Sequence, residues 1–80
     1  MAARLKKFTK AQETMIVAAI DEASKILGGQ GKLAKLCGVS DSTVTGWKKL
    51  RSRVAGHLTD MIYKRTKVAQ YRFRPDLYKK

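Results

Sequence analysis

Small polar and basic side chains recur in residues 41–49 at positions that share one side of a helix. This segment reads DSTVTGWKK, and at about 100° per residue Ser42, Thr45 and Lys49 point away from the apolar residues of the same helix. Hydroxyl and ammonium groups of this kind can hydrogen-bond to base edges in the DNA major groove. The chemistry that these residues predict is therefore recognition of bases, without catalysis.

A carboxylate and several cations flank this face. Asp41 stands at the start of the helix, where it can accept from cytosine N4 or only favour the positive end of the helix dipole. The amides of Gly31 and Lys32, with the side chain of Gln30, open the preceding helix and suit an anion. The predicted phosphate-binding residues are Gln30, Gly31, Lys32, Lys35, Lys48, Arg51 and Arg53.

The elements that must position these groups have the pattern of a helix-turn-helix over residues 30–50. Two short helices are predicted, at about 31–37 and from an N-cap at Ser40 to about residue 50. Gly38 lies between them, where a positive φ is easy only for glycine. The residues suited to packing the two helices together are Leu33, Ala34, Cys37, Val39, Val44 and Trp47. In this motif the second helix lies in the major groove.

Further helices are predicted on both sides of the motif. Thr9 and Gln12 have the spacing of a capping box, and a helical apolar pattern follows them up to Gly28. Residues 54–66 show one apolar helical face. From Val68 the apolar pattern shifts toward period two, which predicts a short strand or an extended arm.

Tyr71 and Phe73 lie on the same side of that last segment, and two interpretations of them stay open. They can cap the core of the single chain, or they can form a dimer interface by pairing across a two-fold axis. Two aromatic residues on one side of a segment are compatible with both interpretations.

Composition favours a polyanionic partner. Eighteen Lys and Arg stand against six Asp and Glu, for a formal charge of +12, which points to nucleic acid first and an acidic membrane surface second. One cysteine and one histidine cannot supply a four-ligand zinc site. The scattered carboxylates argue against a metal-dependent nuclease or recombinase fragment. We therefore predict no metal, no cofactor, no small-molecule substrate and no enzymatic activity.

The length of 80 residues predicts one mainly α-helical domain over 1–80. Its predicted parts are a basic N-terminal arm (1–9), a helical core (10–66) and a C-terminal strand or tail (67–80). The longest apolar run, 15–20, is far shorter than the roughly 20 residues of a membrane span. A cytoplasmic protein without membrane association is predicted.

Residues 30–49 resemble the helix-turn-helix of Cro-type phage and prophage repressors, within the lambda-repressor-like group of folds. The ending RFRPDLY at 72–78 is similar to the Arg-Pro-Asp ending of many prophage Cro-like proteins. The resemblance covers about residues 30–80. It implies a small homodimer that binds a palindromic double-stranded DNA operator in the nucleoid of a bacterial host and represses transcription.

The same resemblance assigns roles to single positions. By family position, Gln30 matches a phosphate-contacting site, and the base-reading sites match Asp41, Ser42, Thr45 and Gly46. Glycine at position 46 has no side chain to make the base contact expected there, so Lys49 becomes the more important candidate for reading a base. The extension before residue 10 is a second departure, and it predicts an arm that reaches along or into the minor groove.

Two other functions remain open on the sequence. One is a phage or antitoxin-like protein that uses this fold to bind a protein partner, because a repacked surface is not visible from sequence. The other is an architectural DNA-binding accessory factor. Selection of bound sequences from random DNA distinguishes these alternatives from a repressor.

Overall fold

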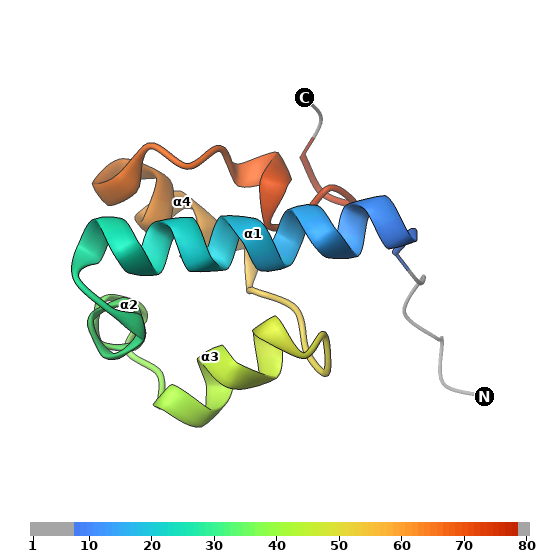
Figure 1. Ribbon diagram of the computed structural model, residues 1–80. Coiled ribbons are helices and arrows are strands. Elements are labelled where there is room, and N and C mark those ends of the chain that lie inside the picture. Colours follow the sequence, from blue (N-terminus) through green and yellow to red (C-terminus); the bar gives the residue numbers. More distant parts are fainter. Residues whose placement is uncertain (1–7, 79–80) are drawn as a thin grey trace.

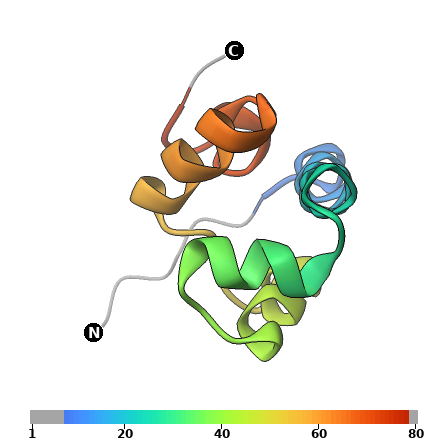
Figure 2. The same ribbon diagram turned by 90° about the vertical axis from the view of Figure 1, so that its left-hand side faces the viewer.

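The structure, a computed structural model, describes residues 8–78, which form four α-helices and one 3₁₀ turn (Figure 1). The elements are α1 (Lys10–Leu27), α2 (Gln30–Cys37), α3 (Asp41–Lys48), α4 (Gly56–Thr66) and η1 (Gln70–Arg72). The long helix α1 has α4 and η1 along one side, and the pair α2 and α3 lies below them in the views of Figures 1 and 2. The predicted helical bundle is confirmed. The predicted N-terminal arm falls almost entirely in residues 1–7, outside the described part.

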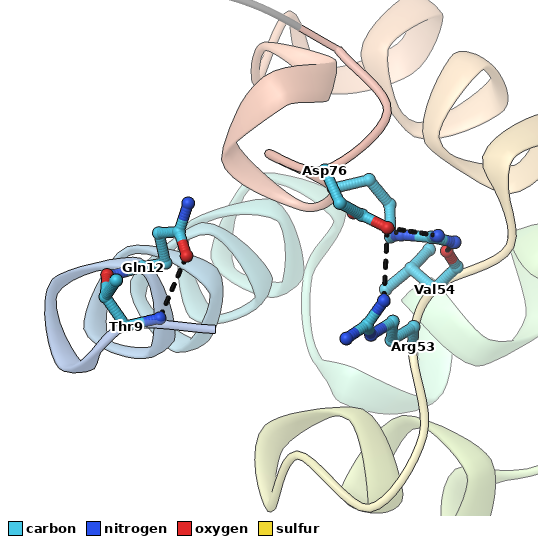
Figure 3. A network of polar contacts seen from close by, with 6 residues as sticks. Thr9, Gln12, Arg53, Val54 and Asp76 are labelled. Atoms are coloured by element: carbon cyan, nitrogen blue, oxygen red, sulfur yellow. Dashed lines mark hydrogen bonds and ion pairs between the residues drawn. The ribbon is translucent and has the colours of Figure 1, made fainter. Parts of the chain in front are cut away.

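Local hydrogen bonds set both ends of α1. The Thr9 hydroxyl accepts from the Gln12 backbone N–H at 3.1 Å, and the Thr9 N–H donates to Gln12 Oε1 at 2.9 Å (Figure 3). At the other end Gly28 has φ 101° and donates its N–H to the Ser24 carbonyl at 3.0 Å. The predicted capping box and the predicted glycine stop are both confirmed.

The hydrophobic core lies where α1 meets the other helices. Ile16, Ala19, Ile20 and Ala23 follow the helical spacing of one face and are at most 3% exposed. The other elements contribute Leu33, Ala34, Cys37, Val44, Trp47, Val54, Leu58, Ile62, Val68 and Phe73. None of the helices within residues 8–78 has the length and apolar character of a membrane span.

The predicted strand or extended arm after Val68 is wrong. Val68 and Phe73 are both buried, and η1 lies between them, with the Phe73 N–H bonded to the Gln70 carbonyl at 3.0 Å. A strand needs a neighbouring strand to satisfy its backbone groups, and residues 8–78 contain no strand. The segment therefore satisfies its backbone locally in a 3₁₀ turn, and its apolar residues flank that turn.

Phe73 lies in the hydrophobic core of the single chain. Its ring is 1% exposed in the single chain and is the largest fully buried side chain among the described residues. The single chain therefore buries Phe73 in its own core, as the first of the two interpretations expects. Tyr71 remains partly exposed.

An ion-pair cluster ties the C-terminal end to the link between α3 and α4 (Figure 3). Asp76 pairs with Arg74 at 2.7 Å and with Arg53 at 3.1 Å. Arg74 also donates Nη1 to the Val54 carbonyl at 2.9 Å. Hydrogen bonding from Arg74 holds the pKa of Asp76 below its usual range, and the same bond raises the pKa of Arg74.

Because of this cluster, the free energy of unfolding should depend on pH in the acid range. A depressed carboxyl pKa stabilises the fold above the unfolded-state value of about 4, and the effect is lost as pH falls through the folded-state pKa. The side chain of Asp76 is 23% exposed, so we expect Asp76→Asn to lower the free energy of unfolding by only about 1 kcal/mol at pH 7. Urea unfolding from pH 7 to pH 2 measures this difference, which should shrink below about pH 4.

The control for the Asp76 prediction is Asp60→Asn. Asp60 pairs with Lys64 within one helix at 3.2 Å, and both side chains are at least half exposed. Exposed pairs of this kind contribute a few tenths of a kcal/mol at most, about 0.3–0.5. A stability difference for Asp76→Asn that stayed constant down to pH 2 would contradict the role assigned to the carboxylate.

Candidate nucleic-acid interface

The turn between α2 and α3 is built by Gly38 and Ser40. Gly38 has φ 69° and ψ 31°, the left-handed region that glycine enters without steric cost. The next N–H, that of Val39, bonds back to the Ala34 carbonyl at 3.0 Å. The Ser40 hydroxyl then accepts from the Thr43 N–H at 3.2 Å and caps α3. The predicted glycine turn and serine N-cap are confirmed.

The buried side of the motif fixes how α3 is oriented. Val44 and Trp47 are 0% and 3% exposed, and Leu33 from α2 is 0% exposed. Cys37 is also buried, and burial raises the pKa of its thiol, as expected for a small core residue and not for a nucleophile. Because these side chains face the core, the opposite side of α3 must face outward.

The outward side of α3 carries the predicted base-reading residues. Asp41, Ser42 and Lys49 are exposed, while Thr45 and Gly46 are half-buried. In Figures 1 and 2 α3 lies at the edge of the described part, and no other helix covers its outer side. We call these five positions the α3 face, and its exposed members are Asp41, Ser42 and Lys49.

Gln30 links the two helices of the motif. Its Nε2 donates to the Thr45 hydroxyl at 3.0 Å and to the Asp41 carbonyl at 3.3 Å. Both amide hydrogens are engaged in this way, so the side chain of Gln30 has no free N–H for a phosphate. The first backbone amides of α2, at Gln30 and Gly31, have no partner within the helix and keep that capacity.

The predicted phosphate-binding cations divide into two groups. Lys32, Lys35 and Arg51 are exposed and make no ion pair within residues 8–78. Lys48, in contrast, pairs with Asp21 of α1 at 2.9 Å. Arg53 lies in the Asp76 cluster, with its side chain 16% exposed. The sequence predicted phosphate contact for all five, whereas the structure gives carboxylate partners to two of them.

Ion pairing concentrates unneutralised charge on the motif. Four of the six acidic residues, namely Asp21, Glu22, Asp60 and Asp76, pair with Lys48, Arg72, Lys64, Arg53 and Arg74. In residues 8–78 the cations without an acidic partner are Lys10, Lys25, Lys32, Lys35, Lys49, Arg51, Arg65 and Lys67. Four of these eight lie within 30–51. The helix-turn-helix therefore carries half of the cations that have no acidic partner within the described residues.

Sequence reasoning missed three contacts that shape this surface. It counted Asp21 only among the scattered carboxylates, and the structure pairs it with Lys48 across α1 and α3. It gave Gln30 no partner on α3. It noted the Arg-Pro-Asp ending only as a resemblance, although Asp76 holds Arg53 in place. No local pattern signals such contacts, because the partners are far apart in the chain.

The family model described as bacterial toxin YdaS matches residues 20–80. The matched region runs from the second half of α1 through the helix-turn-helix and α4 to the C-terminal end. None of the curated proteins and none of the solved structures compared with the chain matches it.

Proposed function

This chain belongs to the YdaS toxin family, and we propose that it is a sequence-specific double-stranded DNA-binding protein that represses transcription. The family match indicates a small bacterial regulatory or toxin-like protein. The proposal of sequence-specific DNA binding rests on the α3 face. Its exposed hydroxyl and ammonium groups, at Ser42 and Lys49, adjoin cations that have no acidic partner.

In the proposed complex α3 enters the major groove and α2 contacts the phosphate backbone. Ser42, Thr45 and Lys49 read base edges, and Asp41 has a secondary role. Lys32, Lys35 and the first amides of α2 hold phosphates and set the position of the protein on the duplex. The proposed activity is binding alone, without a metal, a cofactor or a catalytic step.

We propose that the protein binds as a homodimer. A single module of this size contacts few bases, and two copies on half-sites about 34 Å apart multiply the affinity. Of the two aromatic residues considered for the dimer interface, Tyr71 is partly exposed and Phe73 is buried in the single chain, so we place Tyr71 in that interface.

Selection of bound sequences from a random DNA pool at two salt concentrations tests the proposal. An inverted repeat with half-sites about one helical turn apart supports a dimeric repressor. Strong, salt-sensitive binding without any enriched sequence supports an architectural factor instead. Absence of binding at moderate salt overturns the DNA proposal.

Substitutions on the α3 face should separate specific from non-specific binding. We expect Ser42→Ala or Thr45→Ala to weaken binding to the selected sequence by about 1–3 kcal/mol and to leave binding to random DNA nearly unchanged. Lys35→Ala is the control, because an exposed cation that contacts phosphate should weaken binding to both DNAs alike. Titrations with both DNAs measure this. Specific binding untouched by both alanine substitutions would refute the assigned face.

The family description favours one second candidate. The family is one of bacterial toxins, and a toxin that acts on a protein of the host could use the same α3 face. In that case the protein would bind DNA weakly or not at all, and the same α3 substitutions would reduce toxicity without any change in DNA affinity.

A further inference from the structure

We propose that Gln30 makes Thr45 a hydrogen-bond donor toward DNA, so that Thr45 selects acceptor atoms on base edges. This inference rests on the proposed function, because it specifies how one side chain of the α3 face chooses its base. Gln30 acts as a positioning residue and need not touch a base itself.

The orientation of the Gln30 amide follows from its partners. The Asp41 carbonyl can only accept a hydrogen bond, so the nitrogen of the Gln30 amide must face it, at 3.3 Å. The same nitrogen lies 3.0 Å from Thr45 Oγ1, and the hydroxyl therefore accepts there. This pair is partly buried, which limits competition from water.

The Thr45 proton is left for an acceptor outside the chain. Threonine in a helix often donates to the carbonyl four residues earlier, as Thr14 does at 3.1 Å and Thr66 does at 2.8 Å. At Thr45 that carbonyl belongs to Asp41, which accepts from Gln30 instead. Within residues 8–78 no group accepts the Thr45 proton. Accepting an N–H also polarises the hydroxyl and strengthens it as a donor.

Donor character limits what Thr45 can select. The acceptors of the major groove are guanine O6 and N7, adenine N7 and thymine O4, and its donors are the amines of adenine and cytosine. Thr45 should therefore favour the acceptors guanine O6 and N7, adenine N7 and thymine O4 over the two amines. Ser42 is the internal contrast, because it is exposed and its hydroxyl makes no hydrogen bond within the described residues. Its hydroxyl can turn to donate or to accept.

Base analogues in the selected operator test this directly. Each analogue removes one acceptor (purine N7, guanine O6 or thymine O4) or one amine donor. We expect one acceptor deletion to weaken binding of the unmodified protein about five- to tenfold and to have no effect on Thr45→Val, which keeps the shape of the side chain. If the group read through Thr45 is an exocyclic amine, the inference is wrong.

Gln30→Met, which keeps the length of the side chain without its polar atoms, tests the positioning role. We expect it to lose the same acceptor discrimination as Thr45→Val, with no further loss in the double variant. Discrimination at the base read by Ser42 should persist, and the unfolding midpoint should show that the variant folds. A uniform loss on all sequences that adds to the effect of Thr45→Val would overturn the inference in favour of a phosphate role.

The two proposals fail in different ways. A pool without any preferred sequence would overturn the proposed function and this inference together. A preferred operator in which every analogue acts equally on the unmodified protein and on Thr45→Val would overturn only this inference.

Discussion

Replacement of Phe73 by alanine is expected to lower the free energy of unfolding by about 3–5 kcal/mol. The ring is 1% exposed and packs in the core that includes α1 and α4. Its removal loses the transfer energy of the ring and leaves a cavity that the surrounding helices fill only in part. A domain of 80 residues has a total stability of about 4–12 kcal/mol, so this one change removes a large share of it.

Urea unfolding followed by the fluorescence of Trp47 measures the effect of Phe73→Ala. Tyr71→Ala is the matched control, because Tyr71 is aromatic, lies two residues away and is partly exposed. We expect the control to cost less than about 1 kcal/mol. Equal losses for the two variants, or a loss for Phe73→Ala that depends on protein concentration, would show that the ring belongs to an interface and not to the core of one chain.

An increase in monovalent salt from about 50 to about 200 mM is expected to weaken binding to DNA about a thousandfold. Lys32, Lys35 and Arg51 are exposed and have no acidic partner within residues 8–78. In the proposed dimer, two copies of this set should neutralise about six phosphates, which predicts a log–log slope near −5. Titrations at four or more salt concentrations measure the slope.

Lys48 supplies the control for the salt prediction. Its ammonium group is 2.9 Å from an Asp21 carboxylate oxygen, so it should release fewer counterions than Lys35 when DNA binds. We expect Lys35→Ala to flatten the slope by about one unit for each bound protomer and Lys48→Ala to change it less. If the two substitutions flatten the slope equally, the ion pair between Lys48 and Asp21 opens when DNA binds, and Lys48 contacts phosphate as Lys35 does.

The predictions from sequence that were confirmed concern hydrogen bonds between near neighbours. The capping box joins Thr9 and Gln12, and the cap of α3 joins Ser40 and Thr43, each over three residues. Gly38 turns the chain because its own φ is positive. These caps and turns depend on residues that are at most three positions apart in the chain. Residue type and spacing are therefore enough to predict where they occur.

The strand predicted after Val68 was wrong because an apolar pattern does not specify which element the segment packs against. Alternation after Val68 suits a strand, but a strand forms only if another strand lies beside it. The surroundings of this segment are α1 and α4, and against helices it buries Val68 and Phe73 through a 3₁₀ turn. Periodicity alone therefore could not decide between an extended and a turned backbone.

The sequence by itself determined the four helices, the caps at Thr9 and Ser40, and the turn of the helix-turn-helix at Gly38. Only the tertiary structure decided which side chains pair. Gln30 meets Thr45 across 15 residues, and Arg53 meets Asp76 across 23. Lys35 and Lys48 have the same chemistry, yet only Lys48 lies beside Asp21. The physical reason is that such partners become neighbours only after the helices pack on a common core, and packing depends on the whole chain.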